Sequence, residues 1–187
     1  MTKTELMEHR IQYYKAPISN AVSNHRVGIS NLFDYITGSY YKQATDTLRS
    51  IDDPALRRTY KTRHFDFVCF SGLFAYRRDE SLLAHSNLLC LDFDHIAPRI
   101  PELRERLPLD PYFETELLFT SPSGDGLKWV VEIDTQRTDH RTWFRALSAY
   151  VHETYNLESD PACINLSRAC FLPQDTNAYV NPLICPF

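Results

Sequence analysis

The sequence predicts an α+β fold in which helices cover one side of a largely antiparallel sheet, and three observations lead to this prediction. Leu88–Phe93 is almost wholly apolar, which is typical of a central strand. From Leu127 to Asp134 apolar and polar side chains alternate, as they do along a half-buried strand. From Trp143 to Tyr155 the apolar residues instead recur every three or four positions, which indicates one face of a helix that Thr138 caps.

Cap and turn residues predict the remaining elements. Ser30 predicts the start of a helix over Asn31–Thr37, which Gly38 ends. Asp53 and Pro54 have the residue types of an N-cap and a first helical position, so a helix is expected from there to Lys61. Further helices are expected at 41–50 and 101–107, and strands at 11–14, 67–70, 116–120 and 168–172.

Two parts of one globular unit are expected. Residues 1–64 are predicted to form a helical N-terminal portion packed on an α+β core of residues 65–187. The last residues, 181–187, do not have the composition of a polar tail. We therefore expect the chain to be the N-terminal part of a longer protein.

Composition excludes several classes of protein. Hydrophobic residues make up 43% of the 187 residues, enough to build a core, so disorder is not expected. The formal net charge of -4 argues against holding duplex DNA over the whole surface, so any nucleic-acid contact must be local or metal-assisted. No apolar run approaches the ~20 residues that cross a bilayer, and no partner membrane is expected.

Five cysteines are present, an odd number without any Cys-x-x-Cys pair. The start of the chain has no apolar segment typical of a signal peptide. Buried free thiols and a cytoplasmic location are therefore expected.

Asp92 and Asp94 are the first candidate site. Residues two apart on a strand point to the same face, about 6.5–7 Å apart, so the two carboxylates would repel each other. A bound Mg²⁺ or Mn²⁺ would relieve that repulsion, since both ions prefer oxygen ligands. The alternative is a strand that simply ends in acidic residues, with Asp94 starting a turn. His95 is either a further ligand or an ordinary exposed histidine.

The segment from Ser121 to Lys128 is the second candidate. Its Asp-Gly pair predicts a hairpin turn, which by itself explains Gly124 and Gly126. The same turn can instead bind a phosphate through its backbone N–H groups, the Ser123 hydroxyl and the Lys128 ammonium.

The third candidate is Asp160 with Arg168. An arginine at the start of an apolar strand often binds a carboxylate or phosphate through two hydrogen bonds. Asp160 can also be a turn residue or cap before proline, and Arg168 a surface charge. Asp175 is a competing acid in this region. The sequence has no zinc-ligand spacing, Walker A motif, Rossmann glycine pattern or supported Ser-His-Asp set.

Taken together, these motifs resemble the archaeo-eukaryotic primase superfamily in its primase-polymerase clade, and within it the VirE N-terminal domain family. The resemblance covers residues 65–181 and depends on four phrases in order: Phe70–Phe74, Leu91–His95, Ser121–Lys128 and Ser167–Phe171. Proteins of that family belong to bacterial mobile elements, and the domain often precedes a helicase-like ATPase in the same protein.

The resemblance implies an RRM-like catalytic core that carries out nucleotidyl transfer in DNA replication. It implies that Asp92, Asp94 and Asp160 are catalytic and hold two divalent ions, Mg²⁺ or Mn²⁺. A second set would bind the phosphates of a nucleoside triphosphate: Ser121, Ser123, Gly124, Gly126, Lys128 and Arg168. Single-stranded DNA or a primer-template would be the other partner. Lys128 departs from the pattern, because the superfamily usually has histidine there and lysine does not shuttle a proton as imidazole does.

Three functions remain open at this point. The first is a primase-like nucleotidyltransferase, active or degenerate. The second is a non-catalytic module that binds nucleotide or single-stranded DNA beside the ATPase. The third is a metal-dependent phosphoesterase that uses the same acids. Basic residues form either solvated surface or a local template groove: Arg57, Arg58, Lys61, Arg63, Arg77 and Arg78.

Overall fold

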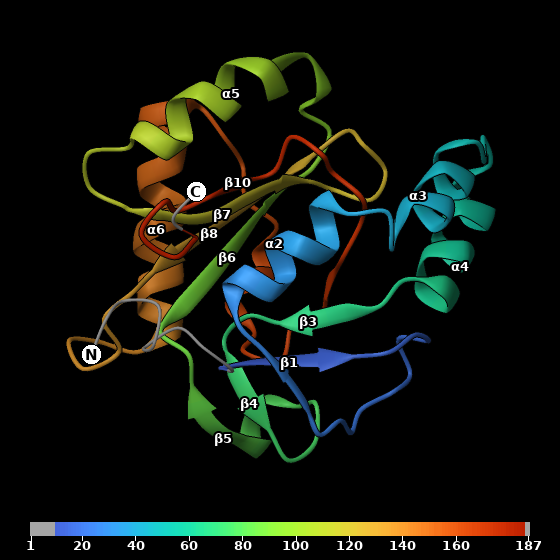
Figure 1. The fold of residues 1–187 in the computed structure, drawn as a ribbon. Helices are drawn as coiled ribbons and strands as arrows, with labels where there is room; N and C mark the ends of the chain where they lie inside the picture. Colours follow the sequence, from blue (N-terminus) through green and yellow to red (C-terminus); the bar gives the residue numbers. More distant parts are fainter. Residues whose placement is uncertain (1–9, 186–187) are drawn as a thin grey trace.

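Two four-stranded antiparallel sheets and a separate hairpin make up the β structure of residues 10–185, which this computed structural model describes (Figure 1). The first sheet has the order β2-β1-β3-β9, with β1 Ile11–Tyr14, β2 His25–Val27, β3 Phe67–Cys69 and β9 Cys170–Phe171. The second has the order β10-β7-β8-β6, with β6 Leu88–Phe93, β7 Thr115–Thr120, β8 Leu127–Glu132 and β10 Tyr179–Val180. The hairpin pairs β4 Gly72–Phe74 with β5 Leu82–His85.

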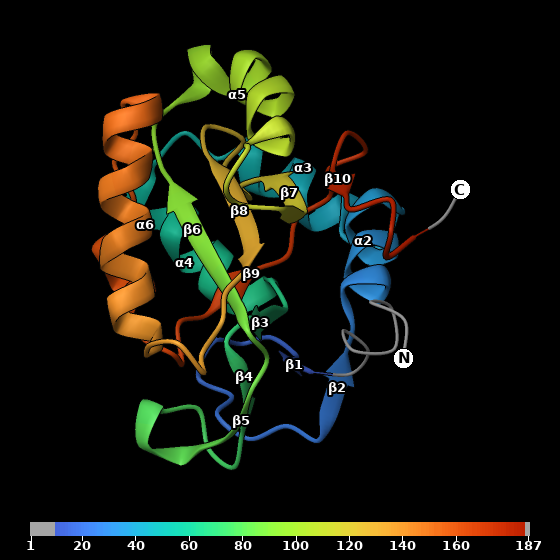
Figure 2. The same cartoon turned by 90° about the vertical axis from the view of Figure 1, so that its left-hand side faces the viewer.

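Five α-helices lie in the described residues: α2 Ile29–Thr37, α3 Lys42–Arg49, α4 Pro54–His64, α5 Ile100–Arg106 and α6 His140–Tyr155. Short 3-10 helices also occur, among them η1 Asp79–Ser81 and η4 Pro161–Ile164. Figure 2 shows α6 along one side of the second sheet and α2 on the opposite side. No described helix has the length and apolar character needed to cross a membrane.

Each face of the second sheet packs into its own core cluster. On β6, Leu89, Leu91 and Phe93 join the cluster that contains Phe144 and Leu147 of α6. Burial of these side chains is the main stabilising contribution of this face. The other face of β6 carries Leu88 and Cys90, which pack in the cluster formed with α2 and the first sheet.

This alternation along β6 places Asp92 on the face toward α2 and the first sheet. The predicted strand of residues 88–93 is confirmed, and β8 pairs with it from Leu88↔Glu132 to Phe93↔Leu127. In that register Asp92 lies opposite Lys128. The sheet therefore positions both side chains by pairing alone.

The α+β class is confirmed, with two differences from the expected arrangement. The strands form two sheets rather than one, and helices cover both faces of the second sheet rather than one side. The pattern of apolar residues could not show this, because it predicts which face of an element is buried but not what covers it.

The expected elements are present with shifted ends. Asp53 caps α4 through a 2.8 Å hydrogen bond from the Leu56 amide, as predicted. Gly28 rather than Ser30 precedes α2, and Asp139 rather than Thr138 caps α6 by accepting from the Thr142 amide. Strands β2, β4, β5 and β10 were not predicted, since runs of two to four residues are too short to show a period.

The predicted helical N-terminal portion also contains strands. β1 pairs with β3 in the register Gln12↔Cys69 to Tyr14↔Phe67. Residues on both sides of position 64 thus share one sheet. The first nine residues of that portion lie outside the described residues.

Candidate metal and nucleotide site

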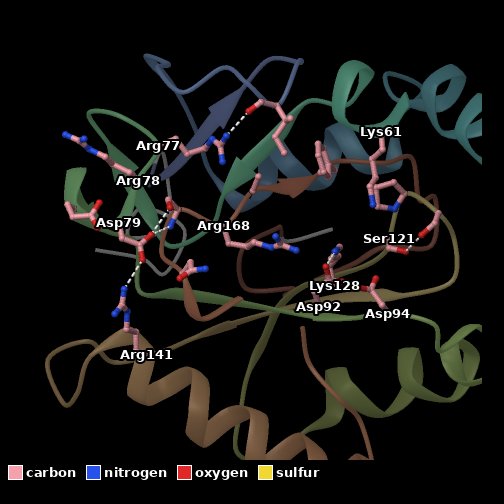
Figure 3. A pocket seen from close by; sticks show the side chains of 18 residues that line it. Lys61, Arg77, Arg78, Asp79, Asp92, Asp94, Ser121, Lys128, Arg141 and Arg168 are labelled. Carbon is pink, nitrogen blue, oxygen red and sulfur yellow. Dashed lines mark hydrogen bonds and ion pairs between the residues drawn. The ribbon is translucent and has the colours of Figure 1, made fainter. Parts of the chain in front are cut away.

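Three carboxylates converge at the end of β6. Asp92, Asp94 and Asp160 each offer one oxygen, and these three atoms lie within 4.8 Å of one another. They come from β6, from the residue that follows it, and from the residue that precedes η4 (Figure 3 shows the first two). The predicted grouping of Asp160 with the Asp-x-Asp pair is therefore present in the structure.

Asp160 is held next to β6 by its backbone. The Asp160 amide donates a 2.8 Å hydrogen bond to the Asp92 carbonyl oxygen. One carboxylate oxygen of Asp160 accepts from the Ala162 amide at 2.9 Å and so caps η4. The other accepts from the Arg168 guanidinium at 2.5 Å. Capping and site formation are therefore both roles of this one side chain.

Lys128 forms a buried ion pair with Asp92. Its ammonium donates to Asp92 Oδ2, and both residues are less than a tenth exposed. Burial alone would lower the pKa of Lys128, but the adjacent Asp92 carboxylate raises it above its usual value. Burial raises the pKa of Asp92, the Lys128 charge opposes this, and the neighbouring Asp94 raises it further. The pair keeps a positive charge fixed against the acids.

The second oxygen of Asp92 is the clearest sign that this group of acids suits a cation. Asp92 Oδ1 is buried and has no hydrogen-bond partner among the described residues. A buried oxygen left in this state costs about 1–3 kcal/mol. Asp94 is exposed and forms no hydrogen bond or ion pair within residues 10–185, so the three acids are paired with only two cations, Lys128 and Arg168. This oxygen-rich set of ligands fits a hard divalent cation.

Lys61 of α4 is a further cation at this site. It lines the same cleft as Asp92 and Asp94, and its ammonium lies 5.7 Å from the centre of the Phe171 ring. No described residue forms an ion pair with it. Burial lowers the pKa of Lys61, the Lys128 charge lowers it further, and the two aspartates oppose both effects. An unpaired, half-buried ammonium is suited to bind an anion.

The loop between β7 and β8 folds as the predicted tight turn. Gly124 has a positive φ of 84°, and a Cβ on Gly126 would lie 2.4 Å from the Phe93 carbonyl oxygen. Only glycine allows that close approach of the loop to the end of β6. Ser123 donates to Asp125 at 2.5 Å and Ser121 accepts from the Gly126 amide at 3.1 Å.

The predicted phosphate-binding residues of this loop do not all line the same cavity. Ser121 and Ser123 line the cleft that contains Asp92, whereas Gly124 lines a different cavity beside Arg49. Arg49 donates to the Pro122 carbonyl oxygen at 3.1 Å and so supports the loop from outside the cleft. Lys128 lies at the base of the cleft, where Asp92 occupies its ammonium.

Two further candidates from the sequence, the possible ligand His95 and the competing acid Asp175, are not part of the group of three carboxylates. His95 is exposed, has a positive φ of 57°, and its Nδ1 lies 2.9 Å from Asp125. Asp175 pairs with Arg104 and accepts from the Thr120 amide. Neither belongs to the group of converging oxygens.

The cleft has a volume of about 580 Å³ and extends well beyond the acids. Its other end is formed by the loop after β4 and the start of α6, which carry Arg77, Arg78, Asp79 and Arg141 (Figure 3). Arg168 lies between the two ends. Arg141 was not predicted as a site residue, and Lys61 was named only as one of several basic residues of a possible template groove, because no motif distinguishes one lysine or arginine of a helix from its neighbours.

The five cysteines are free thiols, as expected. Burial raises the pKa of Cys69 and of Cys163 to about 12, so neither is a reactive thiolate at neutral pH. They therefore serve as packing groups.

Comparison with known protein families shows which family the chain belongs to. The model of the family described as BT4734-like, N-terminal domain matches residues 60–180. This range covers more than half of the chain, and the protein belongs to that family. Searches of curated proteins and of solved structures returned no significant match. The matched range includes Lys61, all three carboxylates and the β7–β8 loop.

Proposed function

We propose that this chain is a metal-dependent nucleotidyltransferase domain of the primase-polymerase type, within a replication protein of a mobile element. The observation that carries the proposal is the convergence of Asp92, Asp94 and Asp160, where the buried Asp92 Oδ1 has no hydrogen-bond partner in the described part of the chain. Lys61 adds at the same place a cation that forms no ion pair within residues 10–185. Acids that hold a cation next to positive side chains form the arrangement that phosphoryl and nucleotidyl transfer requires.

Each side chain has a role that follows from its contacts. The three carboxylates would hold Mg²⁺ or Mn²⁺, which when bound acidifies a 3'-hydroxyl and stabilises negative charge on the leaving pyrophosphate. Lys61 and Arg168 would bind the phosphates of a nucleoside triphosphate, since both line the cleft that contains Asp92 and Asp94. The Ser121 and Ser123 hydroxyls would add neutral donors at its edge.

The ordered phrases that resemble the VirE N-terminal domain family support the same proposal. All four lie within residues 60–180, the range matched by the family model. A helicase-like ATPase in the same protein and a cytoplasmic location would accompany this function.

The test is metal-dependent nucleotide binding in Asp94→Asn. Asp94 is exposed and unpaired in the described residues, so the substitution removes a ligand without breaking an ion pair. We expect calorimetry to show nucleotide binding with Mn²⁺ in the wild type and a loss of at least tenfold in affinity in the variant. Asp52→Asn, an exposed aspartate outside the cleft, is the matched control. No metal-dependent binding in the wild type would refute the proposal.

A non-catalytic binding module is the second candidate, and the Lys128–Asp92 pair favours it. An ammonium engaged with a buried carboxylate is a fixed charge rather than a proton carrier. The two candidates differ in a primer-extension assay with Mn²⁺. Extension selects the enzyme, whereas binding of nucleotide or single-stranded DNA without extension selects the module.

A further inference from the structure

The loop that joins β4 to β5 forms the wall of the cleft farthest from the acids. Arg77 anchors this loop, because it donates to the Ile18 carbonyl oxygen at 2.7 Å and lies 5.1 Å from the centre of the Phe67 ring. Next to it, Tyr76 is 49% exposed. The loop therefore has a rigid base and presents an aromatic ring to solvent.

Arg78 stands beside that ring. Its guanidinium lies 5.7 Å from the centre of the Tyr76 ring, and its Nε donates to the Ser81 hydroxyl at 2.7 Å. Across residues 10–185 no carboxylate forms an ion pair with Arg78. Its remaining donors are free to bind an anion.

Arg141, at the start of α6, completes the wall. It lies 3.2 Å from Asp79 and is itself 55% exposed. Asp79 also accepts hydrogen bonds from the amide and the hydroxyl of Ser167, at 2.9 and 2.7 Å. These contacts join the hairpin, the helix and the segment that carries Arg168 into one surface.

The charge of the cleft contrasts with that of the chain. The chain has a formal net charge of -4, yet the cleft is lined by six basic side chains and four carboxylates. The basic ones are Lys61, Arg77, Arg78, Lys128, Arg141 and Arg168. They extend from the hairpin loop to the acids (Figure 3). A polyanion would be attracted to this groove and repelled elsewhere.

We propose that Arg78 and Arg141, which line the cleft, and the exposed Tyr76 beside Arg78 form a hairpin wall that binds single-stranded nucleic acid and leads the strand to the three acids. An exposed aromatic ring next to cations is the combination that holds unpaired bases and their phosphates. In a duplex the bases are already stacked on one another, so the Tyr76 ring has nothing to stack with. This assignment deepens the proposed function, on which it depends for what happens at the acids.

The experiment measures binding of a labelled oligothymidylate of about 12 nucleotides to the full chain by fluorescence anisotropy. The variants are Tyr76→Ala, Tyr76→Phe, Arg78→Ala and Arg141→Gln. The controls are Tyr112→Ala and Arg145→Ala, which remove an exposed tyrosine and an exposed arginine that neither line the cleft nor belong to the β4–β5 loop. Circular dichroism melts check that each variant is folded.

We expect the double variant Tyr76→Ala with Arg78→Ala to weaken oligothymidylate binding at least tenfold. Tyr76→Phe and both controls should bind the oligothymidylate as the wild type does. Each lost phosphate contact should reduce the slope of log affinity against log salt by about 0.7. An oligouridylate measured alongside shows whether DNA or RNA is preferred. Wild-type binding to neither strand, or equal losses in wall and control variants, would overturn the assignment.

A parallel titration keeps the two proposals separate. Binding of a single nucleotide with Mn²⁺ by the wild-type chain tests the acids without a strand present. If the wild type does not bind the nucleotide but the Tyr76 and Arg78 variants lose strand binding, the strand-binding proposal holds and the nucleotidyltransferase proposal fails. If the wild type binds the nucleotide but no variant weakens strand binding, the nucleotidyltransferase proposal holds and the strand-binding proposal fails.

Discussion

Asp92 and Lys128 show how a single pair of residues affects both stability and the site. The ammonium balances one carboxylate inside the protein, and removing it leaves Asp92 buried and uncompensated. Loss of one partner of a buried pair typically costs about 3–5 kcal/mol, whereas replacement of both by apolar groups is often close to neutral.

We therefore expect Lys128→Met to reduce the free energy of unfolding by about 3–5 kcal/mol at pH 7, measured by urea denaturation. The double variant Lys128→Met with Asp92→Leu should lose far less. Lys42→Met is the control, because Lys42 forms an exposed pair with Asp46 at 2.6 Å, worth less than about 1 kcal/mol. Equal losses in the single and double variants would contradict this account.

At the residue scale the sequence predicted that the three acids lie together, and it named Lys128 and Arg168 beside them, but it did not single out Lys61 or Arg141. Asp-x-Asp at the end of an apolar strand has a fixed geometry, since alternate residues share a face. Asp160 was placed by resemblance alone, and its backbone bond to Asp92 explains why it arrives there. Lys61 lies on a helix with several basic residues, and only the packing of α4 beside β9 distinguishes it.

At the scale of the elements, Asp175 links the segment after β9 to its neighbours. Asp175 accepts from the Thr120 amide of β7 and pairs with Arg104 of α5, while its own amide donates to the Ile36 carbonyl of α2 at 2.8 Å. Burial alone would raise the pKa of Asp175, but the Thr120 amide and the Arg104 charge together hold it below its usual value. The side chain and the backbone of this one residue together join three elements.

Because its pKa is lowered, the contribution of Asp175 to stability depends on pH. Its contribution is present above the unfolded-state pKa of about 3.9 and is lost as pH falls through the lower pKa of the folded state. We expect Asp175→Asn to cost about 1.5–3 kcal/mol at pH 7 and progressively less as pH falls below about 4. Urea midpoints from pH 7 to pH 3 measure this, with Asp46→Asn as the exposed control. A cost that stays constant with pH would refute the assignment.

Elements were predictable where their period is long enough to see. β6, β7, β8 and α6 have six or more residues and were expected close to their observed bounds. The hairpin β4–β5 has three- and four-residue strands and was missed, although its loop forms one wall of the cleft. The start of α2 shifted because the Gly28 amide donates to the Asn31 side-chain oxygen at 3.0 Å, a contact that no local preference for Ser30 reveals.

For the whole molecule, the cleft is the place where separate parts of the fold meet. Lys61 comes from α4, Asp92 and Lys128 from the second sheet, and Arg168 from the segment before β9. A sequence cannot give this arrangement, because which surfaces face one another depends on how the two sheets pack. A ligand bound in the cleft would therefore stabilise the molecule as a unit rather than one element.

This coupling leads to a prediction for thermal unfolding. An ion that binds only the folded chain stabilises it by about 2.7 kcal/mol at 100 times its Kd, which is roughly 5–10 °C in Tm for a domain of this size. We expect Mn²⁺ to raise the Tm of the wild type by that order and a chelator to reverse it. Asp94→Asn should show little shift, because the ion loses an exposed ligand, whereas Asp52→Asn should respond as the wild type does. An equal rise in Asp94→Asn would mean that the ion binds elsewhere, and the three carboxylates would then have no part in holding it.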